Sequence, residues 1–234
     1  MCWRQKCSAA IRQTLRRDPK PILCYVTDRR TLAGPHGGDS EVALAAAIRR
    51  AVAASVDTIQ IREKDLEARV LAECVRGAVV AARGSATKIV VNDRLDVALA
   101  AGAAGVHLGE ASLPLAAVTA WRVAAGAKMA IGVSCHSLES CLAAEHEGAD
   151  YILFGPVFAT PSKASFGPPQ GLERLARACE SVRLPVLAIG GVTELNAKSC
   201  FLAGAAGIAA IRLFQEAENV AEVVSRLRRL NLPV

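Results

Sequence analysis

The feature that most constrains this 234-residue chain is an alternation, repeated eight times after residue 20, of short apolar runs and longer runs with helical periodicity. Short runs that are apolar throughout are typical of parallel strands buried on both faces. The predicted strands are 22–27, 58–64, 88–92, 105–108, 129–134, 151–154, 186–189 and 207–211. The predicted helices are 41–54, 68–82, 94–101, 113–124, 138–147, 171–181, 194–203 and 217–230.

Eight strand–helix units in a chain of this length are most economically closed into a ring. We therefore predict an α/β fold, a single-domain (β/α)8 TIM barrel. The alternative is an open doubly wound sheet, which normally carries a glycine-rich fingerprint after its first strand. Here Asp28 and Arg29 follow that strand, so the barrel is favoured.

Composition and charge exclude several classes of protein. An apolar content of 52% excludes disorder, and no apolar stretch reaches the roughly 18 residues of a membrane span. Residues 1–20 carry +5 of the net charge of +6, so the rest of the chain has no basic surface suited to nucleic acid. We expect residues 1–20 to be a basic N-terminal extension, because they lack the apolar core of a secretory signal, although a transit peptide has a similar composition. We expect residues 21–234 to be the catalytic domain.

The eight cysteines contain no CxxC pair and no zinc-like spacing with histidine. Most of them lie within apolar segments, where a thiol behaves as a small hydrophobic group. We therefore expect reduced cysteines in a cytoplasmic protein.

In a (β/α)8 barrel the active site lies at the carboxyl ends of the strands. Alternation along the second predicted strand places Gln60, Arg62 and Lys64 on one face. Two cations and an amide that point into the mouth of a barrel predict a phosphate or diphosphate ligand. The alternative is a surface pair of Arg62 with Glu63.

The third predicted strand ends in Asn92 and Asp93. A carboxylate beside an amide at the mouth is suited to Mg²⁺, which prefers oxygen ligands and shares them with a diphosphate. The same pair of residues is also common in turns and helix caps.

Ser134 and His136 follow the fifth predicted strand on the same side of the chain. His136 is a candidate acid/base, although Ser137 next to it also predicts the start of a helix. The other histidines show no constellation in the sequence: His36, His107 and His146.

The loop after the sixth predicted strand, residues 155–171, is long and rich in glycine and proline. Its length favours a lid over a substrate, with a merely flexible loop as the alternative. Thr160, Ser162 and Lys163 offer two hydroxyls and a cation to phosphate oxygens.

The loops after the seventh and eighth predicted strands are where such barrels often bind phosphate through backbone N–H groups. Gly190 and Gly191 follow the seventh strand, and Ile211 and Arg212 end the eighth. Glycine lets the backbone approach a ligand closely. These positions are therefore predicted to form a phosphate cradle.

Taken in order from about residue 22 to residue 214, these motifs resemble those of the thiamine-phosphate synthase family. The segments that carry the resemblance are YVTD (25–28), QIREK (60–64), NDR (92–94), GVHLG (105–109), GVS (132–134), GADY (148–151), GPVFATPSK (155–163) and AIGGV (188–192). The resemblance implies a TIM-barrel transferase that joins a hydroxymethylpyrimidine diphosphate to a thiazole phosphate with Mg²⁺ and releases diphosphate.

The resemblance also implies roles for individual residues. It assigns the pyrimidine diphosphate to Gln60, Arg62, Lys64, Asn92 and Lys163, Mg²⁺ to Asp93, and the reaction centre to Ser134. It assigns the thiazole phosphate to Thr160, Ser162, Gly191 and Ile211.

Two departures from the family pattern concern this site. A second metal-binding aspartate is usual where this chain has Ser112, and Glu110 is the candidate replacement. A small serine is usual near the phosphate where this chain has Arg212, which either binds the phosphate or fills its pocket.

Two alternatives to the synthase stay open at this point. Related thiazole tautomerases share the barrel and a similar segment at 136–139, and use its histidine, here His136, as acid/base without the synthase's metal site. The other is a non-catalytic barrel that binds thiamine precursors. The partners expected are small-molecule substrates, neither nucleic acid nor membrane, and homo-oligomer formation is left open.

Overall fold

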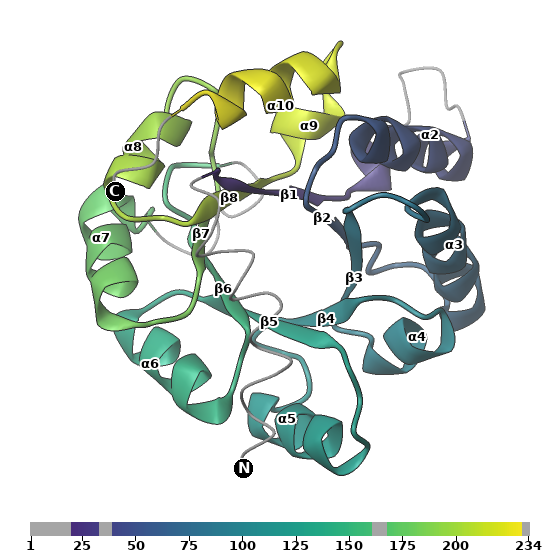
Figure 1. The fold of residues 1–234 in the computed structure, drawn as a ribbon, viewed down its shortest axis with the longest axis horizontal. Helices are drawn as coiled ribbons and strands as arrows, with labels where there is room; N and C mark the ends of the chain where they lie inside the picture. Colours follow the sequence, from purple (N-terminus) through teal and green to yellow (C-terminus); the bar gives the residue numbers. More distant parts are fainter. Residues whose placement is uncertain (1–19, 33–38, 161–167, 231–234) are drawn as a thin grey trace.

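The computed structural model describes residues 20–32, 39–160 and 168–230. Eight parallel strands form a closed barrel in the order β1 to β8, as the sequence predicts (Figure 1). The strands are β1 Ile22–Val26, β2 Thr58–Ile61, β3 Lys88–Asn92, β4 Gly105–Leu108, β5 Ala130–Cys135, β6 Tyr151–Phe154, β7 Val186–Ile189 and β8 Gly207–Ala210. The predicted division of the chain into an extension (1–20) and a single domain (21–234) stays a prediction, because residues 1–19 lie outside the described part of the chain.

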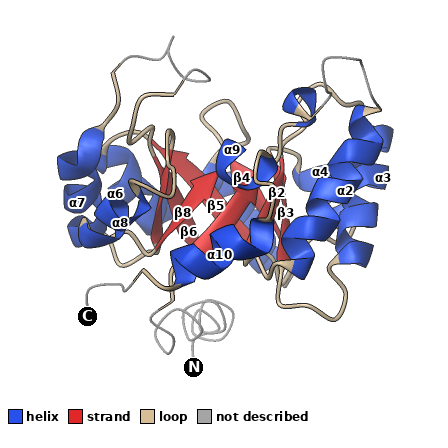
Figure 2. Ribbon diagram, turned by 90° about the horizontal axis from the view of Figure 1, so that it is seen from above, coloured by secondary structure: helices blue, strands red, loops and turns tan. Residues whose placement is uncertain are grey.

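Helices surround the barrel on its outside (Figure 2). They are α2 Ser40–Ala53, α3 Ala68–Ala81, α4 Leu95–Ala100, α5 Leu115–Ala124, α6 Leu138–Glu147, α7 Gly171–Ser181, α8 Ala197–Leu202, α9 Arg212–Gln215 and α10 Val220–Arg228. A 3₁₀ turn, η1, spans Arg29–Thr31. No sequence pattern predicts η1 or α9, because elements of three or four residues are too short to show a period.

The second strand is shorter than predicted, ending at Ile61 rather than at Lys64. Backbone pairing with β1 stops after the Thr27 N–H donates to the carbonyl of Gln60 at 2.9 Å. Beyond this point a side chain takes the place of the backbone acceptor of β1, because the Thr27 hydroxyl accepts the Arg62 N–H at 3.0 Å. Simple alternation therefore cannot be extended to Lys64.

The start of α6 is fixed by Ser137, as predicted. Its hydroxyl accepts the Ser140 N–H at 3.1 Å, and the Ser140 hydroxyl accepts the Ser137 N–H at the same distance. This reciprocal capping box satisfies donors that have no partner within a helix. It also fixes where the chain leaves β5, next to His136.

Two aspartates brace the amino-terminal end of the barrel. Asp57, just before β2, accepts the Leu23 N–H and pairs with Arg228, both at 2.7 Å. Asp150, just before β6, accepts the Ile131 N–H at 2.8 Å and pairs with Arg122. Each carboxylate thus ties a neighbouring strand to a helix, at the end opposite the expected active site.

The main core lies between the barrel and its helices, where buried aliphatic and aromatic side chains from the strands pack against those from the helices. Inside the barrel a second, smaller cluster of buried side chains comprises Cys24, Val26, Leu153, Leu187 and Ala209. The six cysteines of the described residues are all free, in agreement with the prediction for them. Within the described ranges, we find no helix with the length and apolarity needed to cross a bilayer.

Candidate active site

Four polar side chains lie on the inward side of neighbouring strands. Residues paired in register on neighbouring parallel strands face the same side of the sheet. Gln60 is paired with Val26 of the interior cluster, and His107 is paired with Asn92 on one side and with Gly132 on the other. Ser134 lies two residues beyond Gly132 on the same face of β5. Strands β2 to β5 therefore give the barrel a polar half, formed by Gln60, Asn92, His107 and Ser134.

Asp93 follows β3 with a backbone φ of +61°, a left-handed conformation that aspartate tolerates better than most residues. This turn brings its carboxylate back beside Asn92, whose amide nitrogen donates to it at 2.7 Å. Ser112 also donates to the carboxylate, as does the Gly109 N–H at 3.2 Å. Partial burial opposes ionisation, but the hydrogen bonds from Ser112 and Gly109 and the charge of Lys64 outweigh it and lower the pKa of Asp93.

Lys64 reaches the same carboxylate, with Nζ 3.7 Å from Asp93 Oδ2. Its side chain is 58% exposed, because β2 ends at Ile61 and Lys64 extends from the loop that follows the strand. The residue nevertheless comes to the mouth of the barrel, because the loop after β2 turns there. Arg62 is half-buried in that loop.

Glu63, between these two cations, is a structural residue that the sequence analysis did not single out. It is 4% exposed and accepts hydrogen bonds from the Thr27 hydroxyl at 2.6 Å and from the Arg29 N–H at 3.1 Å. The Arg29 guanidinium pairs with it at 3.3 Å. This buried set holds the loop that carries Arg62 and Lys64, and Glu63 makes no surface pair with Arg62 among the described residues.

Gln60 is 2% exposed, and its amide nitrogen has no hydrogen-bond partner within the described residues. A buried donor without a partner costs stability. Such a donor in the polar half of a barrel is suited to donate a hydrogen bond to an acceptor atom of a ligand.

His107 contradicts the expectation that it belongs to no constellation. Its Nε2 lies 2.9 Å from Ser134 Oγ, and its Nδ1 lies 3.2 Å from the Tyr151 hydroxyl. Burial lowers its pKa to about 3, so the ring is neutral. The signal for this histidine was its place on β4, two residues beyond Gly105 on the same face and beside Asn92 of the neighbouring strand.

His136 lies just beyond β5, with its Nδ1 in contact with the Gly155 carbonyl. Its Nε2 is 3.8 Å from a carboxylate oxygen of Glu110, whose side chain is 73% exposed. Glu110 thus sits beside His136, whereas Ser112 takes the place next to Asp93. Metal binding by Glu110 stays a prediction.

The predicted phosphate cradle is only partly described. Gly191 has a φ of +65°, and a Cβ there would come within 2.5 Å of the Ala159 carbonyl, so only glycine allows this approach. Thr160 follows Ala159 and is half-buried, Ile211 is half-buried, and Arg212 is exposed at the start of α9. Ser162 and Lys163 lie outside the described residues, as do residues 161–167 of the predicted lid in general.

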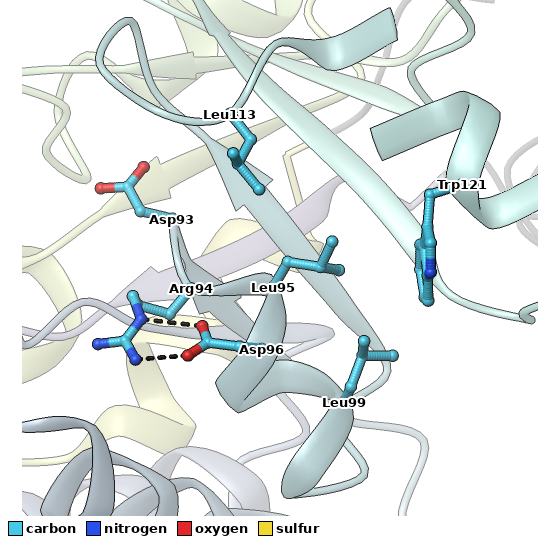
Figure 3. Close-up of a pocket in the computed structure, with 7 residues that line it drawn as sticks. All are labelled: Asp93, Arg94, Leu95, Asp96, Leu99, Leu113 and Trp121. Atoms are coloured by element: carbon cyan, nitrogen blue, oxygen red, sulfur yellow. Dashed lines mark hydrogen bonds and ion pairs between the residues drawn. The ribbon is translucent and has the colours of Figure 1, made fainter. Parts of the chain in front are cut away.

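A cavity of about 450 Å³, with Asp93 at its edge, lies between α4 and α5. It is lined by Leu95, Leu99, Leu113 and Trp121, with an ion pair of Arg94 and Asp96 on one side. The Asp93 side chain points away from Leu99 and Trp121 (Figure 3). The lining is mostly apolar, and its cation, Arg94, is already paired with Asp96, so the cavity is poorly suited to a diphosphate.

Fold and site together define an enzyme of the (β/α)8 class whose mouth combines cations, an ionised carboxylate and neutral polar groups. This combination suits a reaction of anionic substrates in which charge must be neutralised more than protons moved.

Comparison with known proteins gives the family. The model of the thiamine monophosphate synthase family matches residues 25–214. The chain is 43% identical over 189 residues to a putative thiamine-phosphate synthase of Geobacter sulfurreducens, covering 81% of this chain and 84% of that protein. It is 42% identical over 182 residues to the thiamine-phosphate synthase of Methanocella arvoryzae, covering 78% and 84%. The chain therefore belongs to the thiamine monophosphate synthase family.

Solved structures agree with this assignment. The thiamine phosphate pyrophosphorylase of Pyrococcus furiosus aligns with a TM-score of 0.75 and 35% identity, covering 89% of this chain and 95% of that one. A 3-hexulose-6-phosphate synthase, at 20% identity and a TM-score of 0.62, shares the fold. The family resemblance seen in the sequence is confirmed, and the synthase is favoured over the tautomerase.

Proposed function

We propose that this protein transfers the aminopyrimidine methylene group of hydroxymethylpyrimidine diphosphate to a thiazole phosphate, forming thiamine phosphate and releasing diphosphate. The observation that carries the proposal is the meeting of Lys64, Asp93 and Asn92 at one mouth. The sequence segments that hold them are separate, and the barrel brings them to the polar half that also contains Gln60, whose amide nitrogen has no hydrogen-bond partner among the described residues.

The residues present are suited to Mg²⁺. Asn92 uses its amide nitrogen on Asp93, which leaves its amide oxygen for another ligand, and Ser112 adds a hydroxyl oxygen. The described residues contain no group of three histidine, cysteine or acidic side chains that could hold a metal alone. Asp93 would thus hold Mg²⁺ together with neutral oxygens and the diphosphate, and the ion would supply positive charge to the departing diphosphate.

The chain's own groups mainly position and neutralise charge. Arg62, Lys64 and Lys163 would bind the diphosphate, while Gln60 and Asn92 would hold the pyrimidine. Electron donation from the aminopyrimidine ring stabilises the methylene cation as the carbon–oxygen bond breaks and its electron pair leaves with diphosphate. Thr160, Ser162, Gly191 and Ile211 would hold the thiazole phosphate so that it captures the cation.

Arg212 is the departure with the clearest consequence. Its side chain is exposed at the entrance to α9 and makes no ion pair with the described residues. An exposed guanidinium here does not fill a pocket, so we assign it to the thiazole phosphate, where its planar fork can bind two oxygens. The small-molecule substrates and a cytoplasmic location are part of the same proposal.

The experiment that tests the function is a paired assay of the purified protein. We expect thiamine phosphate to form from the two substrates in the presence of Mg²⁺. We expect His136→Ala to reduce the rate of thiamine phosphate formation much less than loss of the Asp93 charge does. General acid–base catalysis is worth about 10²–10⁴-fold. A protein without coupling activity, whose metal-free aromatisation of the thiazole tautomer falls by that factor in His136→Ala, would be a tautomerase instead.

A further inference from the structure

Three side chains form a continuous hydrogen-bonded path that runs from β6 into the polar half of the barrel. The Tyr151 hydroxyl of β6 meets His107 Nδ1 at 3.2 Å, and His107 Nε2 meets Ser134 Oγ at 2.9 Å. The two rings lie with their centroids 5.6 Å apart. His107 is 1% exposed, whereas Ser134 is half-buried near the carboxyl end of β5. The path therefore begins in the barrel interior and ends at the candidate active site.

Gly132 makes this path possible. Strand register places it between His107 and Tyr151, on the inward side of β5. A Cβ at Gly132 would lie 2.1 Å from Tyr151 Cζ and 2.4 Å from its hydroxyl oxygen. Any side chain here would displace the phenol from His107, so the glycine is required by the path itself.

The hydrogen bonds of the path have one direction. Burial raises the pKa of Tyr151 well above its ordinary value, so the phenol keeps its proton. Within the described part of the chain its hydroxyl has only His107 as a partner, so it donates to Nδ1. Both ring nitrogens of the buried His107 face hydroxyl groups, and no carboxylate pairs with the ring among the described residues, so the neutral ring carries its proton on Nε2 and donates to Ser134 Oγ. In the opposite tautomer the buried Tyr151 O–H would lack an acceptor.

We propose that Tyr151 and His107 are positioning residues that hold Ser134 as a hydrogen-bond donor to the diphosphate group of the substrate. Because Ser134 accepts from His107, its own O–H is available to the ligand. Negative charge develops on the diphosphate as it departs, and a donor there stabilises it. A donor to the pyrimidine ring would instead withdraw electrons from the cation.

The identity of the ligand rests on the proposed function, but the direction of the hydrogen bonds does not. The first test therefore needs no activity. Nitrogen-15 NMR of histidine-labelled protein, with the His107 signals assigned by their loss in His107→Gln, should show the proton on Nε2 and none on Nδ1. A proton on Nδ1 overturns the proposal.

The second test separates positioning from stability. Tyr151→Phe should lower kcat about 10-fold with little change in KM, and should have no further effect in a Ser134→Ala background. Thr87→Val is the matched control, because Thr87 donates to the Val56 carbonyl at 2.8 Å before β3, far from the mouth. It should lower stability without lowering kcat. Unchanged kcat in Tyr151→Phe, or an equal loss in the Ser134→Ala background, overturns the proposal.

The third test concerns the ligand. Inorganic diphosphate with Mg²⁺, measured by calorimetry, should bind Ser134→Ala about 3- to 10-fold more weakly than the parent protein. Equal affinity overturns the assignment to diphosphate. If the parent protein makes no thiamine phosphate, the proposed function fails while the NMR and diphosphate results still decide the inference.

Discussion

The two halves of the barrel interior differ in what they contain. Strands β1, β6, β7 and β8 contribute an apolar cluster of buried side chains that includes Cys24, Leu153 and Leu187. Strands β2 to β5 contribute polar groups, among them an amide nitrogen with no partner in the described residues. Apolar packing stabilises the barrel whether or not a ligand is bound, whereas a buried polar group lowers stability until a ligand satisfies it. One half thus supports the fold, and the other is prepared for the substrate.

The largest expected effect comes from removing charge beside the polar half. Asp93→Asn keeps a residue that tolerates positive φ and keeps most of its size, but loses the carboxylate. We expect kcat/KM for coupling to fall about 10²–10³-fold, with a melting temperature close to that of the parent protein. Steady-state kinetics at saturating Mg²⁺ and calorimetry measure the two quantities. A large loss of stability would show that Asp93 supports the fold instead.

The reciprocal change belongs to the apolar half. Leu187 is 2% exposed and lies in register with Leu153 and Gly207, so Leu187→Ala leaves a cavity on the apolar side of the barrel interior. We expect the free energy of unfolding to fall by about 2–5 kcal/mol, measured by urea denaturation. The remaining folded protein should retain its kcat. A loss of kcat larger than the loss of folded protein would contradict the division between the two halves.

His107 makes the polar half sensitive to acid. Its pKa in the folded protein is about 3, below the usual value of 6.5, because burial disfavours the charged ring. The unfolded chain therefore binds a proton that the folded protein refuses, and stability falls as pH falls from about 6.5 toward 3. We expect a contribution of about 1.4 kcal/mol per pH unit in this window. His107→Gln should lose this part of the slope in urea denaturation, whereas His146→Gln, on α6, should keep it.

The smallest effect is a contrast between two buried glutamines. Gln215 is satisfied, because Tyr25 donates to it at 2.8 Å and its amide nitrogen donates to the Asp28 carbonyl at 2.7 Å. Gln215→Leu should therefore lower stability, whereas Gln60→Leu should leave it unchanged or raise it by up to about 1 kcal/mol. Gln60→Leu should also weaken binding of the pyrimidine diphosphate about 10-fold, measured by calorimetry. Equal destabilisation by both substitutions would show that Gln60 already has a partner.

The sequence by itself determined the barrel and its family. Eight apolar runs separated by helical periods allow few other folds, because a parallel strand needs helices on its outer face and a packed interior. The start of α6 at Ser137 was also readable, since a capping box is a local pattern. The motifs around Asn92, Asp93 and Thr160 predicted the family in the same way.

Tertiary structure alone decided which of these residues meet. Lys64 reaches Asp93 through a loop held by buried Glu63, and not through strand alternation, because β2 ends at Ile61. His107 looked isolated in the sequence, since its partners Ser134 and Tyr151 come from the next two strands. Local patterns report a residue's own backbone, but contacts between strands depend on register and on the space that Gly132 leaves, which only the closed barrel fixes.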